Sequence, residues 1–333
     1  MESPGYGRLP DVCSTTRDRL PERTHTEGGR VPEIILHQYL LSPFSEKVRK
    51  VFAVKGIAWR AVEQPMWSPK PRLTPLTGGY RRIPVLQIGA DVYCDTACIL
   101  RAIEACFPNP TLFPDEHRGA GDMIAWWADR QLFTVVATLV LATLGNTLPA
   151  EFKADRERMV PGLKIDQLPA HAPHARNQLR AYCHALDRQL GARTFILGDA
   201  FSLADAACFQ ALWFARSDPT AAEIVAAFPA LGAWFARVDA LGQGSATPLD
   251  ADEALEVAAR AEPATTMLVD EGDPNDARPG DRVTVTPDDY AFDPVAGEIV
   301  ALSASDIAVR RRDAQVGEIV VHFPRAGFRL AAA

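Results

Sequence analysis

The stretch that decides the fold is Ser-Pro-Phe-Ser-Glu-Lys-Val-Arg at residues 42–49, which follows a short apolar run at residues 34–36 and opens a helical pattern. A hydroxyl therefore lies at a predicted turn from strand to helix, where unpaired backbone N–H groups favour an anion. Further along, Ile-Pro-Val-Leu at residues 83–86 stands inside a strand-like run, and Asp95-Thr96 opens a second helical pattern. Together these stretches predict a small α/β unit.

The hydropathy pattern supplies the rest of this unit. Segment 64–82 contains four prolines and two adjacent glycines, so we expect an irregular loop that lines a site instead of filling a core. The elements expected between Glu33 and Pro108 are strands at 34–38, 59–62, 85–88 and 92–93, and helices at 45–55 and 97–107.

From about residue 117 to residue 242, apolar residues recur at spacings of three and four, which predicts an all-helical domain. Within it, Ser202 followed by Asp205 predicts a capping box with a role in folding and not in catalysis. The apolar run 132–144 is shorter than the roughly 20 residues of a membrane span, and we expect a buried core helix there. A further helix is expected at residues 250–261.

The last part of the chain changes to alternating apolar and polar residues. This pattern predicts a small all-β module, for which an SH3-like barrel is one possible form. From residue 264 onward it carries seven basic and twelve acidic residues, 7 − 12 = −5, which argues against binding a nucleic acid backbone. We expect the module to pack on the rest of the chain, because a unit of about 50 residues is marginal alone. Its strands are expected at 282–286, 297–302, 307–310 and 317–322.

The whole chain has 333 residues, 47% of them hydrophobic, and a formal net charge of −7, which is enough for more than one domain with a buried core. No signal segment opens it and its six cysteines include no Cys-x-x-Cys pair, so we expect a cytoplasmic protein without a membrane partner. His171 and His174 lie in a proline-rich stretch that looks like a loop, with no carboxylate at helical spacing. We therefore expect no metal site.

The order and spacing of the turn at residues 42–45, the strand at 83–86, the helix start at Asp95-Thr96 and the capped helical region resemble the glutathione transferase superfamily. The resemblance covers residues 33–245. The run from Leu76 to Thr96 also looks like a bacterial branch of that superfamily whose members often lack an assigned substrate.

The resemblance implies an α/β plus all-α fold, and the β-module is not part of the common family pattern. The expected domains are a disordered or extended arm at residues 1–32, a thioredoxin-like glutathione-binding domain at 33–110, an all-helical domain at 115–262 and the β-module at 264–333.

For the active site, the resemblance implies glutathione as co-substrate and no metal. A free thiol has a pKa near 8.5, so catalysis at neutral pH requires a stabilised thiolate. The family's serine and cysteine branches place their catalytic side chain where Ser42 stands, which makes Ser42 the expected hydroxyl donor to the thiolate. The alternative is that Ser42 only caps the helix. Ser45 is the second candidate hydroxyl, and the absence of Cys at position 42 argues against disulfide exchange.

The remaining tripeptide contacts are also implied by the resemblance. The Ile83 backbone would pair with the cysteinyl part across a cis Ile83–Pro84 peptide, unless Pro84 is an ordinary trans proline. Asp95 would face the α-amine and Thr96 the γ-glutamyl carboxylate, unless both are ordinary helix-start residues. Asp-Thr replaces the family's usual Glu or Gln followed by Ser, which shortens the acid by one methylene. The expected glutathione-binding residues are Phe44, Ser45, Lys70, Ile83, Pro84, Asp95 and Thr96, with a solvated Lys70 as an alternative to contact with the glycyl carboxylate.

An apolar electrophile would bind between the two domains. The expected pocket residues are Trp126, Trp127, Arg130 and Phe133, although aromatic residues at helical spacing are also typical of a core. Cys94 and Cys98 flank the γ-glutamyl position, and we interpret them as small core residues, with a reactive thiol as the alternative.

The function expected from the resemblance is a glutathione S-transferase of the detoxification type, acting as a homodimer on a small-molecule electrophile. One alternative is a glutathione-dependent isomerase or lyase, in which the thiolate adds and later leaves. Another is a non-catalytic binding protein that uses the acidic β-module as a docking surface.

Overall fold

The N-terminal part of the described chain forms a four-stranded mixed sheet in the order β2-β1-β3-β4. The computed structural model describes residues 32–264, 268–270, 272–274 and 277–333, so the arm expected at residues 1–32 lies outside the described residues except for residue 32. β1 runs parallel to β2 and antiparallel to β3. The elements are β1 (Ile35–Gln38), α1 (Pro43–Val54), β2 (Ala58–Glu63), α2 (Thr74–Thr77), β3 (Val85–Ile88), β4 (Asp91–Cys94) and α3 (Thr96–Cys106).

These elements confirm the expected βαβ, ββα order, with two local differences. α1 begins at Pro43 instead of Ser45, because Ser42 is its N-cap and proline is favoured in the first helical turn. The loop 64–82 contains the short helix α2, which Gly78 ends in a left-handed conformation at φ +72°.

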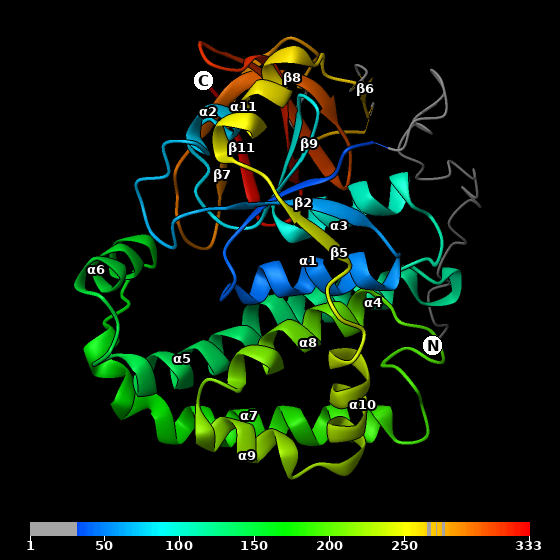
Figure 1. Cartoon of the computed structure of the whole chain (residues 1–333), viewed down its shortest axis with the longest axis vertical. Coiled ribbons are helices and arrows are strands. Elements are labelled where there is room, and N and C mark those ends of the chain that lie inside the picture. The colour runs from blue at the N-terminus through cyan, green and yellow to red at the C-terminus, as the bar shows by residue number, and fades with distance from the viewer. Residues whose placement is uncertain (1–31, 265–267, 271, 275–276) are drawn as a thin grey trace, which may run out of the picture. The chain divides into compact units, whose positions relative to one another are not determined.

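The second part is the expected helical domain (Figure 1). His171 and His174 lie inside α7 and not in a loop, because Pro169 fits the first helical turn and Pro173 is tolerated within the helix. Among the described residues no group of His, Cys, Asp and Glu could hold a metal ion. The helices are η1 (Asp115–His117), α4 (Arg118–Trp127), the π-helix η2 (Ala128–Leu132), α5 (Phe133–Leu144), α6 (Ala150–Met159), η3 (Ile165–Gln167), α7 (Leu168–Leu190), α8 (Leu203–Ala215), α9 (Pro219–Ala226) and α10 (Pro229–Asp239).

The helix expected to be buried at residues 132–144 is only partly so. Of α5, the fully buried residues are Val136, Leu139 and Val140, because only one face packs against α7 and α8. The continuous helical run Gly119–Leu144 has 26 residues and contains an 18-residue window with a mean hydropathy of 1.2, so by length and composition it is long enough to cross a membrane. It carries Asp129, which is ion-paired with Lys47 of α1.

The predicted capping box at the start of α8 is confirmed. The Ser202 N–H donates to the Asp205 carboxylate at 2.9 Å, and both residues are buried. Asp205 also accepts hydrogen bonds from the Ile196 N–H at 2.9 Å and from the Trp234 indole at 2.8 Å. The carboxylate thus ties three segments of the helical domain together, consistent with a role in folding.

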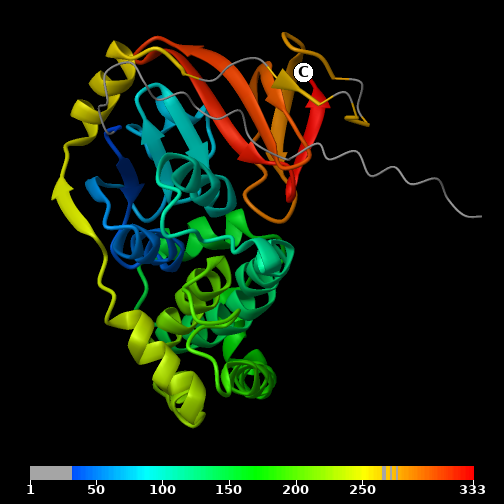
Figure 2. The same cartoon turned by 90° about the vertical axis from the view of Figure 1, so that its right-hand side faces the viewer.

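The C-terminal strands extend the N-terminal sheet. β10 pairs in parallel with β4, and the order is β11-β7-β8-β9-β10-β4-β3-β1-β2-β5, with β6 paired to β8 beside this path. Figure 2 shows the orange and red strands of the module beside the cyan strands of the N-terminal part. β10 pairs with β4 and not with β11, so strand pairing among the described residues does not close the module into a barrel. The elements are β5 (Ser245–Pro248), α11 (Ala251–Arg260), β6 (Leu268–Val269), β7 (Arg282–Pro287), β8 (Val295–Leu302), β9 (Asp306–Asp313), β10 (Gly317–Pro324) and β11 (Phe328–Ala332).

The module shares one hydrophobic core with the loop 64–82, β3 and β4 of the thioredoxin-like domain. Other residues of the thioredoxin-like sheet, together with α1 and α3, pack with the helical domain in a second core. Tyr80 of the loop 64–82 packs its ring 5.9 Å from Phe323 and 6.3 Å from Phe328 of the module. Val92 and Cys94 of β4 are fully buried in the same cluster. This confirms that the module packs on the rest of the chain.

Because the core is shared, we expect a core substitution in the module to destabilise the whole described unit. Phe323→Ala removes a fully buried ring and should lower the free energy of unfolding by about 3–5 kcal/mol. Calorimetry should show a single transition at a lower temperature. The control Phe292→Ala, at a position 44% exposed, should cost about 0.5 kcal/mol or less. Separate transitions for the module and the remainder would contradict the shared core.

A buried histidine should make the fold sensitive to acid. His37 of β1 is fully buried and lies 2.9 Å from Gln87 Oε1 and 3.2 Å from Gln64 Nε2. Burial lowers the pKa of His37 from 6.5 to about 4, although the Gln87 hydrogen bond opposes the shift.

The unfolded chain therefore binds a proton between pH 6.5 and pH 4 that the folded chain does not. The contribution of neutral His37 to stability should be complete above pH 6.5 and fall by about 3 kcal/mol as the pH falls to 4. Urea unfolding of the wild type and His37→Gln across this range should give a shallower pH slope for the variant. Equal pH slopes for the wild type and His37→Gln would show that His37 does not cause the loss of stability in acid.

Candidate functional site

Ser42 lies at the N-terminus of α1, as the sequence predicts. It is 1% exposed, and its Oγ accepts a hydrogen bond from the Ser45 N–H at 3.1 Å. Ser42 is thus a helix cap, but the cap uses the oxygen as an acceptor and leaves the hydroxyl proton available for donation. Capping and donation to an anion are therefore compatible roles for this one side chain.

Ser45 and Phe44 occupy the first turn of the same helix. The Ser45 hydroxyl is buried and has no hydrogen-bond partner in the described residues. The Phe44 ring packs edge-on against Phe133 at a centroid distance of 4.7 Å. The turn that carries Ser42 therefore touches the residue at which η2 passes into α5.

The Ile83–Pro84 peptide is cis, as expected, and immediately precedes β3. Asp95 is the N-cap of α3, with φ +74°, and its carboxylate accepts from the Ala97 N–H at 2.9 Å. Thr96, at the first position of α3, is 4% exposed. Both residues do start a helix, and the positive φ of Asp95 marks a conformation that residues other than glycine rarely adopt.

A buried ion pair lies behind Thr96, and the sequence did not reveal it. The Lys47 ammonium donates to Thr96 Oγ1 at 3.0 Å and to Asp129 Oδ2 at 2.6 Å. Because Thr96 accepts from Lys47, its own proton is directed to another acceptor. Burial raises the pKa of Asp129, and the charge of Lys47 opposes this shift. Lys47 stands in the opening motif, but only the fold brings Asp129 to it.

Cys94 and Cys98 are buried, as expected for small core residues. Burial raises the pKa of the Cys94 thiol well above its usual value. A thiol that stays protonated is a poor nucleophile, so the geometry argues against the reactive-thiol alternative for Cys94.

Lys70 is not solvated, which excludes one of the two expected alternatives. Its side chain is buried, and the ammonium donates to the Pro65 carbonyl within its own loop. Burial, with the nearby charge of Arg156, lowers the pKa of Lys70 to about 8. Asp155 of α6 accepts from Arg156 at 2.7 Å and from the Ser68 N–H at 3.3 Å, which holds the loop against α6.

The four residues expected for the second substrate lie in different surroundings. Phe133 contacts Phe44, and Arg130 is 52% exposed and lies 3.5 Å from Asp288 of the module. Trp126 is half exposed, whereas Trp127 packs edge-on against Tyr182 of α7, with ring centroids 5.3 Å apart. The structure thus brings Phe133 to the Ser42 turn and places Trp127 in a contact within the helical domain.

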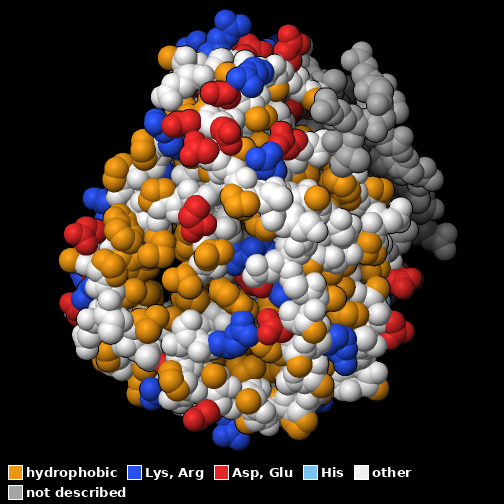
Figure 3. Space-filling view, viewed as in Figure 1, with side chains coloured by type: hydrophobic (Ala, Val, Ile, Leu, Met, Phe, Trp, Pro, Cys, Tyr) orange, Lys and Arg blue, Asp and Glu red, His pale blue; other side chains and the backbone are white. Residues whose placement is uncertain are grey.

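A hollow bordered by hydrophobic side chains lies where the N-terminus of α1, α5 and α6 meet (Figure 3). Leu40 and Leu41, which precede Ser42, are 65% and 66% exposed. Trp67 of the loop 64–82 packs against Phe152 of α6, with ring centroids 6.4 Å apart. We call this region, between the loop 64–82, α1, η2 and α6, the cleft.

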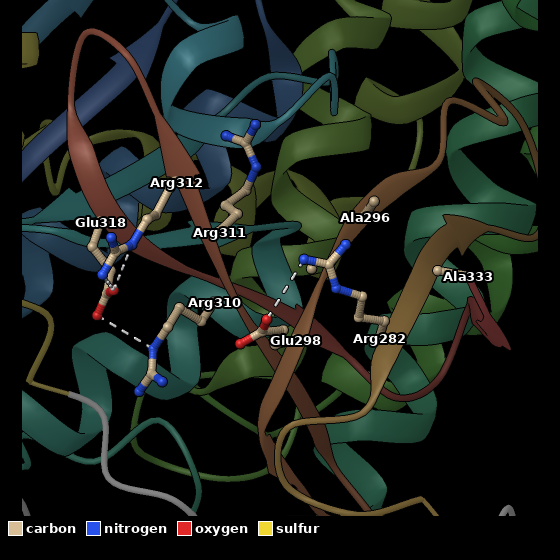
Figure 4. A pocket seen from close by; sticks show the side chains of 9 residues that line it. Arg282, Ala296, Glu298, Arg310, Arg311, Arg312, Glu318 and Ala333 are labelled. Carbon is tan, nitrogen blue, oxygen red and sulfur yellow. Dashed lines mark hydrogen bonds and ion pairs between the residues drawn. The ribbon is translucent and has the colours of Figure 1, made fainter.

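A second hollow, of about 550 Å³, lies on the module and is lined by arginine and glutamate side chains (Figure 4). Glu318 lies 3.3 Å from Arg310 and 3.0 Å from Arg312, and Glu298 lies 3.9 Å from Arg282. Arg282 and Arg312 are more than four-fifths exposed. Solvated pairs of this kind contribute about 0–1 kcal/mol each, and we assign no ligand to this hollow.

The comparisons with known proteins agree with this geometry. Residues 36–111 match the family model of the glutathione S-transferase N-terminal domain, and residues 169–237 match that of the C-terminal domain. A solved structure of a GST-like protein from Pseudomonas syringae is 35% identical, covers 91% of this chain and 100% of its own, and superposes with a TM-score of 0.76. The chain therefore belongs to the glutathione S-transferase superfamily.

More distant relatives support the fold. A glutathione S-transferase from Rhodospirillum rubrum is 22% identical over 62% of this chain and 87% of its own, with a TM-score of 0.51. Glutathione S-transferase U4 of Arabidopsis thaliana is 27% identical over 97 residues, or 29% of this chain. A probable glutathione S-transferase from Solanum tuberosum is 28% identical over 75 residues. This chain spans 42% and 35% of the lengths of these two relatives.

The ion pair behind Thr96 should be important for stability. Lys47→Met leaves the Asp129 carboxylate, 20% exposed, without its partner and should lower the free energy of unfolding by about 3 kcal/mol. The double variant Lys47→Met/Asp129→Asn should recover at least half of the loss in urea unfolding. The control Lys153→Met breaks the more exposed pair with Asp166 and should cost less than about 1 kcal/mol. Equal effects of Lys47→Met and Lys153→Met would contradict this role.

Proposed function

We propose that this protein is a glutathione S-transferase in which the Ser42 hydroxyl stabilises the glutathione thiolate. The observation that carries the proposal is the buried Ser42 Oγ, which accepts from the Ser45 N–H and keeps its proton for a ligand at the N-terminus of α1. The helix terminus adds a partial positive charge that favours an anion at the same point. Lowering a thiol pKa by two units corresponds to about 2.7 kcal/mol, which one charge-assisted hydrogen bond together with the helix terminus can provide.

The chain also provides groups suited to the rest of the tripeptide. Ile83 lies outside the helices, directly before β3. Its backbone groups can therefore pair with the cysteinyl backbone of glutathione. The Thr96 hydroxyl, which accepts from Lys47, can donate to the γ-glutamyl carboxylate. The buried Lys47 ammonium adds positive charge behind that carboxylate. Asp95 is the candidate partner of the α-amine.

The second substrate would bind in the cleft. Phe44 and Phe133 present aromatic surface beside Ser42, and the exposed Leu40 and Leu41 adjoin it. Apolar surface next to a thiolate suits an electrophilic carbon compound whose reacting atom must approach the sulfur without a shell of water. In the reaction the thiolate forms a bond to that carbon, and the leaving group departs with the electron pair of the bond that breaks.

The proposal predicts that the hydroxyl of Ser42, and not that of Ser45, controls the thiolate. An ultraviolet difference titration of bound glutathione between pH 5 and 9 should show thiolate below pH 7 in the wild type. Ser42→Ala should raise the pKa of the bound thiol and lower kcat/KM at least tenfold, or about 1.4 kcal/mol. It should also cost about 1 kcal/mol of stability, because the cap is lost.

Ser45→Ala is the matched control, since it removes a neighbouring buried hydroxyl that makes no hydrogen bond in the described residues. It should leave the thiol pKa unchanged. If Ser42→Ala also leaves the thiol pKa unchanged, Ser42 is only a helix cap. If the wild type fails to bind glutathione at millimolar concentration, the non-catalytic alternative is favoured.

A further inference from the structure

The β-module reaches the cleft through the connection between β7 and β8. Figure 2 shows this orange connection descending from the module toward the helices. At its base the Asp288 N–H donates to the Gly327 carbonyl at 3.0 Å. We name residues 288–291 the cleft loop. From this base, the loop contacts three segments that border the proposed site.

The first contact is with Arg82, the residue immediately before Ile83. The Arg82 guanidinium donates to the Asp289 carboxylate and to the Tyr290 carbonyl. The same guanidinium lies 3.6 Å from the centroid of the Tyr290 ring. Only 10% of the Arg82 side chain is exposed, so these contacts hold it firmly. A shift of the cleft loop would therefore move the residue adjoining the tripeptide-binding peptide.

The other two contacts are with the helical side of the cleft. The Ala291 N–H donates to the Met159 carbonyl at the end of α6, at 2.8 Å. Asp288 lies 3.5 Å from the guanidinium of Arg130 in η2. A Cβ at Gly327 would come within 2.7 Å of the same guanidinium, so the neighbouring turn of the module also approaches η2 closely. The module thus bridges from Arg82 to both helices.

The module also holds the segment that leads to Arg82. Arg311 of β9 donates to the Pro75 carbonyl at 2.8 Å, and a Cβ at Gly78 would lie 2.5 Å from its Nε. The next aromatic residue, Tyr80, packs against Phe323 of the module. The loop 64–82 therefore rests against the module over most of its second half.

Backbone strain marks two points of this arrangement. Among the described residues, Asp95 and Ala291 are the non-glycine residues with positive φ, at 74° and 48°. Such a conformation costs about 1–3 kcal/mol and persists where the surroundings hold it. Asp95 is at the proposed γ-glutamyl position, and Ala291 is held by its hydrogen bond to Met159.

Several charged side chains act on the Tyr290 phenol. Burial raises the pKa of Tyr290, Arg82 opposes this shift, Asp289 and then Asp95 raise the pKa further, and Arg156 lowers it. Asp95 belongs to the proposed tripeptide site and Arg156 to α6. The Tyr290 ring comes from the module and lies against Arg82, the residue next to Ile83 of the proposed tripeptide site.

We propose that the β-module completes the glutathione site: the Tyr290 hydroxyl binds the tripeptide, and Asp289 acts as a positioning residue that holds Arg82 and the adjoining Ile83 in place. The inference rests on the proposed function, because it names further residues of the same site. It also assigns part of the glutathione site to residues outside the two domains that are common to the superfamily.

The test compares the full-length wild type with Tyr290→Phe, Asp289→Asn and the control Glu318→Gln. Glu318→Gln also removes a module carboxylate paired with arginine, but on the surface shown in Figure 4. Calorimetric titration with glutathione should give a Kd about threefold to tenfold higher for Tyr290→Phe, the range expected for one lost hydrogen bond. Asp289→Asn should raise the Kd at least threefold. Glu318→Gln should stay within twofold of the wild type.

Two readouts separate positioning from a general loss of structure. The pKa of the bound thiol and kcat at saturating glutathione should stay near the wild-type values in Tyr290→Phe and Asp289→Asn, while KM for glutathione rises. Rescue of KM by Asp289→Glu would support the positioning role. If Tyr290→Phe and Asp289→Asn bind glutathione as tightly as the wild type, this inference is overturned and the proposed function stands. If the wild type itself does not bind glutathione, both are overturned.

Discussion

The parallel pairing of β10 with β4 is the constraint on which the rest of this structure depends. β4 would otherwise be an open edge of the thioredoxin-like sheet, with unpaired backbone groups that favour association. β10 closes this edge by pairing its backbone with β4. His322 of β10 adds side-chain contacts: it lies 2.8 Å from the Asp91 carboxylate and stacks on the Tyr93 ring, at a centroid distance of 4.3 Å. The pairing buries one face of the sheet in a core shared with the module, and it also sets the position from which the cleft loop reaches Arg82.

A second constraint acts on α1, which lies between the sheet and the helical domain with four charged residues almost fully buried. Each of these charges has a partner: Glu46 pairs with Arg49 at 2.8 Å, Lys47 with Asp129 at 2.6 Å, and Lys50 donates to the Asp239 carbonyl at 2.9 Å. Unpaired charges there would cost several kcal/mol each. The same bonds that satisfy them fix α1 in place, and with it the Ser42 hydroxyl at its N-terminus. Stability and the geometry of the candidate site are therefore coupled.

The match to the GST-like protein from Pseudomonas syringae extends over 91% of this chain, and so into the module that begins at residue 264. The module is therefore shared between these two proteins and is not particular to this chain. The strands of the module join the sheet and a core of the thioredoxin-like domain. Residues 75–82 pack against the module as part of this arrangement. If the module contributes to glutathione binding, selection for substrate can act on a segment outside the two common domains of the superfamily.

The cis Ile83–Pro84 peptide was expected from the family resemblance. The sequence by itself determined the other local features: the capped turn at Ser42, the helix start at Asp95 and the capping box at Ser202. Each of these features depends on a few residues that are close together in the sequence, so the types and spacing of those residues are enough to predict it. Only the tertiary structure decided that Asp129 pairs with Lys47, that Lys70 is buried, that α5 leaves one face exposed, and that Tyr290 of the module lies against Arg82. These features depend on which elements pack together. A charge is compensated, or a side chain is buried, by residues that lie far away in the chain. The periodicity of a single segment does not specify those residues.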